Sequence, residues 1–335
     1  MKHDITLNKA ILHVLDTNVI VPVLSNGLLS MSEEITEFIT KHIQKAVDDA
    51  GVKRTSFRDE SPFKIRIKDY QKHSDELVRI SSEIAQLFFD IMVENLTIPS
   101  ADLLCVDFDL GGENFLGLLK FNYTRSYIHH AKGSKNPVNE ILIQPCALPT
   151  KLDEFVLINL SNAADSEILL KEKKYMVNDE KMFYLSDLIL LSKPVLSEKE
   201  AFSIVDKAVK DIIAKEYNND YAMVNTAKTV FVDDFITDGG LDTDNIADIV
   251  FDGNKKMQAQ FKEQLEENGL FDTTVPILSS IENKICSKQK YITDTGIEIL
   301  IPTEQLKRSD VIEFINNADG TVSVAIKNIG LLSQK

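Results

Sequence analysis

Hydrophobic positions recur at helical spacing in two stretches of the first half of the chain. Behind the capping-box spacing of Ser30 and Glu33, apolar residues three and four apart predict an amphipathic helix. A second run of this kind opens at Ser74 and ends at Pro99. Residues 56–68 carry much charge between these runs, and we interpret them as loop and short strand.

Extended segments surround these helices. They are rich in β-branched and aromatic residues, and Gly111 and Gly112 form a hairpin-like turn between two of them. Short connections favour antiparallel pairing, because parallel pairing needs a crossover of about a dozen residues or more. We therefore expect an antiparallel meander built from residues 103–110, 115–127, 139–144 and 155–160, and we expect residues 5–15 and 18–24 to be extended segments on either side of a turn.

The pattern changes near Lys193 and Pro194. Ser197 and Glu200 have capping-box spacing, and helical stripes follow from there to Gly269. Residues 311–316 and 321–329 flank a turn and predict a terminal β-hairpin. The fold class expected is α+β, with an N-terminal mixed domain over 1–192 and a C-terminal helical region over 193–335 that the hairpin closes.

The composition is that of a globular protein, with 44% hydrophobic and 27% charged residues. The N-terminus resembles no signal peptide, and apolar runs are shorter than the ~20 residues of a membrane helix. Three scattered cysteines fit a reducing compartment. We expect a cytoplasmic protein that does not bind membranes. The net charge of −15 opposes binding to polyanions through the average field.

The sequence contains no complete motif for catalysis, cofactor binding or metal binding. No glycine-rich phosphate loop, nucleophile elbow or zinc spacing is present, so we expect no cofactor, no metal and no catalytic residue. Asp242 and Asp244 resemble the start of a calcium loop that lacks its glycine and closing glutamate. Asp107 and Asp109 resemble half of a nuclease metal site, but Leu118 occupies the position of the second acid.

Charge is distributed unevenly along the chain. Residues 117–140 contain four bases, one acid and interleaved aromatic residues, a pattern that suits nucleic acid. A normal strand with a solvated basic edge is the alternative. Residues 51–80 have eight bases and five acids, whereas residues 219–272 have four bases and twelve acids and would suit a protein partner. The candidate phosphate contacts are Lys120, Arg125, Lys132 and Lys135, none of which we expect to be wholly buried.

Two stretches resemble a known family. Residues 10–28, which include Val21-Pro-Val-Leu-Ser-Asn-Gly-Leu28, and residues 296–330, which include Gly296-Ile-Glu-Ile-Leu-Ile-Pro302, resemble the bacterial nucleoid-associated protein family (NdpA-like). Length and element order agree across essentially the whole chain. The resemblance implies a cytoplasmic, nucleoid-located protein that binds DNA, without known enzymatic activity and without established functional residues.

The leading hypothesis is a non-catalytic nucleoid-associated protein that binds DNA with little sequence preference and forms a homodimer through exposed strand edges. One alternative is a metal-dependent nucleic-acid enzyme. The other is an interaction scaffold that uses the acidic helical region.

Overall fold

The computed structural model describes residues 3–132, 138–149, 151–161, 166–217, 220–276, 288–308, 310–317 and 319–331. Contacts divide the chain into two compact units, Met1–Val195 and Leu196–Lys335. Each unit is described by itself below. The mixed α+β class predicted from the sequence is confirmed.

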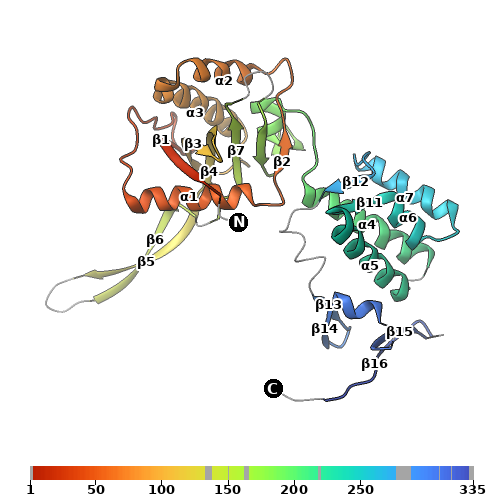
Figure 1. Cartoon of the computed structure of the whole chain (residues 1–335). Coiled ribbons are helices and arrows are strands. Elements are labelled where there is room, and N and C mark those ends of the chain that lie inside the picture. The colour runs from red at the N-terminus through yellow and green to blue at the C-terminus, as the bar shows by residue number, and fades with distance from the viewer. Residues whose placement is uncertain are drawn as a thin grey trace. The chain divides into compact units, whose positions relative to one another are not determined.

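The first unit is built on a six-stranded antiparallel sheet (Figure 1). Its strand order is β1-β3-β4-β7-β8-β2, and every neighbouring pair is antiparallel. The antiparallel pairing predicted between residues 103–110 and 115–127 is confirmed, but residues 139–144 of the predicted meander lie outside this sheet. Gly111 and Gly112 both have positive φ in the β3–β4 turn, a conformation that glycine adopts without steric cost. The strands are β1 (Ile5–Leu15), β2 (Lys53–Thr55), β3 (Ala101–Leu110), β4 (Glu113–Asn122), β7 (Glu154–Asn159) and β8 (Ile168–Lys171).

Helices cover both faces of this sheet (Figure 1). Successive strand residues point to opposite faces, so Leu103 and Cys105 pack under α2 (Pro62–Lys72) and α3 (Leu77–Glu94). Leu104 and Val106 pack against α1 (Glu33–Val47) on the other face. The strands are therefore apolar on both sides, which explains why their sequences are near-continuous hydrophobic runs.

Two local predictions for helices are wrong. The N-cap of α1 is Ser32, whose hydroxyl accepts a hydrogen bond from the Ile35 N–H, and not Ser30. Residues 56–68 are not mainly loop, because α2 begins at Pro62 behind the N-cap Ser61. Proline is favoured in the first helical turn, where its missing N–H would have no partner.

A long β-ribbon corrects the predicted strand over 115–127. This segment is interrupted at Tyr123, and β5 (Thr124–Lys132) leaves the main sheet to pair only with β6 (Val138–Ala147). The main sheet continues past the ribbon without including it, because β4 pairs directly with β7. Figure 1 shows the ribbon extending away from the sheet and its helices.

The second unit begins with helices. The capping box predicted at Ser197 is present in full at the start of α4. Two strand pairs, β13–β14 and β15–β16, follow the helices, and the second of them is the predicted hairpin. The elements are α4 (Glu198–Glu216), α5 (Tyr221–Asp238), β11 (Gly240–Asp242), α6 (Thr243–Val250), α7 (Lys255–Glu267), β12 (Thr274–Pro276), β13 (Lys288–Ile292), β14 (Glu298–Pro302), β15 (Ile312–Asn316) and β16 (Val322–Ile326).

Candidate nucleic-acid interface

The β5–β6 ribbon exposes bases and apolar side chains along the same element. In the register, Tyr127 lies opposite Ile143, and Ile128 lies opposite Leu142. All four side chains are exposed, and the two pairs occupy opposite faces because strand side chains alternate. A two-stranded ribbon with two solvent-exposed apolar faces lacks a core of its own and offers its surface to a partner.

The ribbon positions two of the predicted bases in solvent. Arg125 is exposed near the base of β5, and no ion pair of its guanidinium is found within the described ranges. Lys132 is exposed at the other end of β5, and its Nζ lies 3.9 Å from a Glu140 carboxylate oxygen. Such an exposed, long ion pair contributes little and leaves the ammonium available. Lys135 lies outside the described residues.

Lys120 contradicts the expectation that none of the four bases is wholly buried. Its side chain is 1% exposed in the centre of the sheet, and its Nζ lies 3.1 Å from Glu154 Oε2. Asn122 accepts a second hydrogen bond from the ammonium. A phosphate does not reach this group without opening the sheet, so we withdraw Lys120 as a DNA contact. Linear charge counting missed the burial because Glu154 lies on another strand.

The Lys120–Glu154 pair belongs to a buried polar network. Asn122 Nδ2 and the Tyr175 hydroxyl donate hydrogen bonds of 2.7 and 2.8 Å to Glu154 Oε2. Burial lowers the pKa of Lys120, and the negative charge of Glu154 opposes that shift. Burial, together with Glu154, raises the pKa of Tyr175, so the phenol stays protonated and donates. The network neutralises charge inside the sheet and does not present it to solvent.

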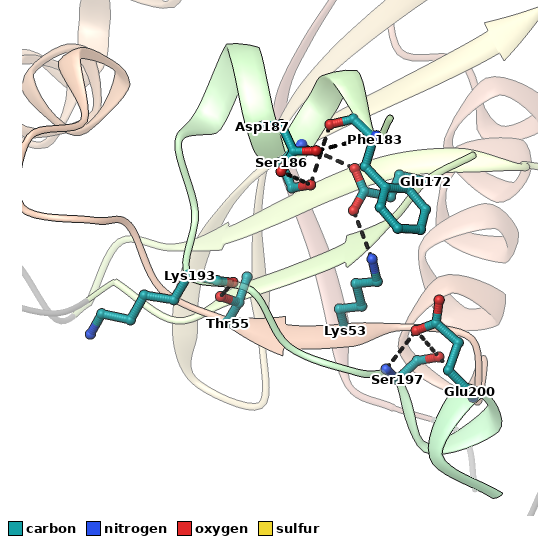
Figure 2. A network of polar contacts seen from close by, with 9 residues as sticks. All are labelled: Lys53, Thr55, Glu172, Phe183, Ser186, Asp187, Lys193, Ser197 and Glu200. Atoms are coloured by element: carbon teal, nitrogen blue, oxygen red, sulfur yellow. Dashed lines mark hydrogen bonds and ion pairs between the residues drawn. The ribbon is translucent and has the colours of Figure 1, made fainter. Parts of the chain in front are cut away.

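In the second candidate segment, residues 51–80, one of the bases is also engaged in a buried ion pair. Figure 2 shows the buried ion pair between Lys53 Nζ and Glu172 Oε1, which are 3.0 Å apart. The Ser186 N–H donates to the other oxygen of Glu172, and the Thr55 hydroxyl donates to the Lys193 carbonyl. These contacts tie β2 to the end of the first unit. Lys53 therefore stabilises the fold and is not a surface base.

Helix α2 retains free bases from this segment. Lys68 and Lys72 are exposed one helical turn apart, with no ion pair found for either in the described part of the chain. The neighbouring acid Asp69 is 2.7 Å from Arg79, which also binds Glu76 at 2.6 Å. Since Arg79 engages the nearby carboxylates, the two lysines form a small basic surface on α2. The sequence signal for it was the spacing of the bases, which the loop interpretation concealed.

Asp107, considered above for a nuclease metal site, is already engaged by hydrogen bonds. Asn8 Nδ2 and Asn114 Nδ2 lie 3.0 and 2.9 Å from its Oδ1, and the Tyr70 hydroxyl donates to Oδ2. Burial and this carboxylate raise the pKa of Tyr70, which keeps the phenol a donor. The arrangement joins β1, β3, β4 and α2. The described residues contain no group of three or more potential metal ligands.

The segment that resembles the start of a calcium loop caps a helix. Asp242 is the N-cap of α6, and its Oδ1 accepts hydrogen bonds from the N–H groups of Asp244 and Asn245. One carboxylate thus satisfies two of the backbone donors that a helix leaves unpaired at its start.

Comparison with protein families gives a match that covers nearly the whole chain. Residues 11–331 match the model of the family described as Nucleoid-associated protein YejK. The chain belongs to this family of nucleoid-associated proteins. The family resemblance carried by residues 10–28 and 296–330 is therefore confirmed. A search of the curated proteins gives no match for this chain. Among the described residues of this family member, no helix is long and apolar enough to cross a membrane.

Proposed function

We propose that this family member is a non-catalytic, cytoplasmic protein of the nucleoid that binds DNA directly through the β5–β6 ribbon, with little sequence preference. The observation that carries the proposal is the ribbon itself, which leaves the main sheet and exposes Arg125 and Lys132. Membership of a nucleoid-associated family supports DNA as the partner.

The dimensions of the ribbon suit a DNA groove. At about 3.4 Å per residue, the nine residues of β5 extend for about 30 Å. The major groove of B-DNA is about 12 Å wide and admits a two-stranded β-ribbon. Arg125 and Lys132 lie near opposite ends of β5, and we expect each of these long side chains to contact a phosphate beside the groove. Tyr127 lies between them and offers an apolar face to the sugars and bases.

The chemistry of these contacts predicts weak sequence preference. Arginine and lysine neutralise phosphates, which are the same in every sequence. Withdrawal of Lys120 leaves three candidate bases, Arg125, Lys132 and Lys135. Three neutralised phosphates give a slope of log K against log salt of about −2.7, instead of the about −3.6 expected for four. The net charge of −15 further favours a contact that is confined to one projecting element.

The test is fluorescence anisotropy with two unrelated 20-base-pair duplexes at several salt concentrations. The variant Arg125→Ala/Lys132→Ala/Lys135→Ala should weaken binding to both duplexes equally and flatten the salt slope. The control Lys41→Ala/Lys181→Ala removes two exposed lysines of the same unit and should bind like the wild type. Unchanged affinity and slope in the triple variant would contradict the proposal.

The α2 surface defines the alternative outcome of this experiment. If the triple variant binds DNA normally but Lys68→Ala/Lys72→Ala does not, the interface is α2 and the ribbon has another role.

Incubation of wild-type protein with plasmid and Mg²⁺ or Mn²⁺ tests the enzyme alternative. We expect no cleavage, and reproducible cleavage would contradict the non-catalytic assignment.

A further inference from the structure

A lysine-lined cavity lies in the first unit and shares no residue with the ribbon or α2. Its volume is about 310 Å³, at the lower end of the range for small-molecule sites. Lys45 and His42 of α1 line it together with Lys151 and Lys171, and Ala46, Leu152 and Phe155 supply apolar lining. Asp49 is the acidic residue of this lining.

The charge around this cavity is opposite to that of the whole protein. Three lysines surround it in a chain of net charge −15, and Asp49 is the counter-charge in its lining. Asp49 is already engaged, because its Oδ1 accepts a 2.8 Å hydrogen bond from the Gly51 N–H and its Oδ2 pairs with Lys171. The carboxylate thereby holds the Lys171 ammonium beside the cavity. The cavity keeps a surplus of positive charge.

The remaining cations have room to turn toward a ligand. Lys45 is exposed, and no ion pair of it is found where the structure describes the chain. Lys151 pairs with Asp153 at 3.1 Å, but its side chain is 80% exposed and such a surface pair is weak. Lys45 and Lys151 come from different elements. An anion between them therefore receives charge-assisted hydrogen bonds from two sides.

His42 adds a neutral donor at the inner wall. It is 5% exposed, and its ring packs edge-on against Phe38 and Phe121. Burial, and then the charge of Lys45, lowers its pKa, so the imidazole is uncharged at neutral pH and carries one N–H. Beside it, Leu152 and Phe155 offer an apolar surface. Strong cations at the rim and apolar groups inside suit a ligand with an anionic end and a compact apolar body.

We propose that this cavity binds a small phosphate monoester of about mononucleotide size, with its phosphate between Lys45, Lys151 and Lys171. The volume excludes a dinucleotide, and a duplex does not enter a cavity of this size. The site is independent of the proposed DNA contact, because it shares no residue with the ribbon.

Isothermal titration calorimetry of the full chain with AMP tests the proposal. We expect AMP to bind once per chain. Adenosine and inorganic phosphate should bind more weakly, since adenosine lacks the phosphate and inorganic phosphate lacks the apolar body. Lys45→Ala/Lys151→Ala should weaken AMP binding about tenfold or more, because hydrogen bonds to charged groups contribute at least this factor. Lys72→Ala/Lys181→Ala, which removes two exposed lysines that do not line the cavity, is the matched control and should change binding little.

Three results would overturn the proposal. They are no detectable AMP binding at millimolar concentration, AMP binding that Lys45→Ala/Lys151→Ala leaves unchanged, and inorganic phosphate binding as tightly as AMP. Both altered lysines are exposed, so the variant should unfold at the wild-type temperature, and a thermal melt checks this. The same variant should bind duplex DNA normally, which separates this site from the proposed function.

Discussion

At the scale of single residues, the Lys120–Glu154 pair shows how one buried charge depends on its partner. In Lys120→Ala the carboxylate stays buried without its counter-charge, which should lower the free energy of unfolding by about 3–5 kcal/mol. Lys120→Met/Glu154→Gln should recover most of this loss, because glutamine still accepts hydrogen bonds from Asn122 and Tyr175. Urea denaturation followed by circular dichroism measures both. A loss below about 1 kcal/mol in Lys120→Ala would show that the pair is not sealed from water.

His13 makes stability depend on pH. The Ser25 N–H donates to His13 Nδ1 at 3.2 Å, so Nε2 carries the proton that faces Ser81 Oγ at 3.0 Å. Burial lowers the pKa of His13 to about 4 from its ordinary 6.5. Between these values the unfolded chain binds a proton that the folded chain does not, so stability falls as the pH decreases from 6.5 toward 4.

The variant His13→Gln isolates this effect. Its urea midpoint should be lower than that of the wild type at about pH 7, because the ring contacts are lost. The difference between the two proteins should shrink toward about pH 5, since the variant has no imidazole to protonate. A difference that stays constant over this range would contradict the assignment of a neutral His13 in the fold.

At this scale, the sequence predicts which charged side chains are exposed, but it does not show which residues the fold places beside them. Arg125 and Lys132 are exposed as expected, since long charged side chains are rarely buried without a partner. Lys120 is the exception, and the acid that makes its burial possible lies 34 positions away. The basic cavity was missed for the same reason. Lys45, Lys151 and Lys171 are far apart in sequence and meet only in the fold.

At the scale of secondary-structure elements, the start of α4 is a clear test of a sequence rule. The Glu200 N–H donates to Ser197 Oγ at 3.2 Å, and the Ser197 N–H donates to Glu200 Oε2 at 2.8 Å (Figure 2). Ser197→Ala should cost about 1 kcal/mol of stability. Ser203→Ala, at an exposed position inside α4, should cost nothing or stabilise slightly, because alanine is the better helix former. Equal effects of the two changes in urea unfolding would contradict a specific role for the cap.

Local rules predicted elements well where the signal was local. The α4 cap, the turn at Gly111 and Gly112 and the terminal hairpin all depend on neighbouring residues, and the structure confirms them. The ribbon depends on pairing. Residues 115–127 have strand character throughout, but only the pairing of β4 with β7 decides that β5 leaves the sheet. No pattern within the segment contains that information.

At the scale of the whole molecule, the predicted homodimer remains to be tested, and the structure changes where we expect the contact. The edge of β1 is partly covered, because Val14 and Val23 exchange backbone hydrogen bonds of 3.0 and 2.9 Å. The loop that covers this edge instead exposes Ile20 by 95% and Val21 by 67%. Adjacent exposed apolar residues on an ordered loop are typical of an interface, and a twofold axis would bury both loops together.

Light scattering after size exclusion at micromolar concentration measures the mass of the protein in solution and so tests the homodimer. We expect the wild type at twice 37.7 kDa and Ile20→Ser/Val21→Ser at the monomer mass. Ile65→Ser, which removes an exposed isoleucine from α2, is the control and should leave the dimer intact. If each protomer brings one ribbon, dissociation should also weaken binding to a duplex long enough to reach both ribbons, because the second contact becomes intramolecular in a dimer. A wild-type protein that elutes only at 37.7 kDa would disprove the homodimer.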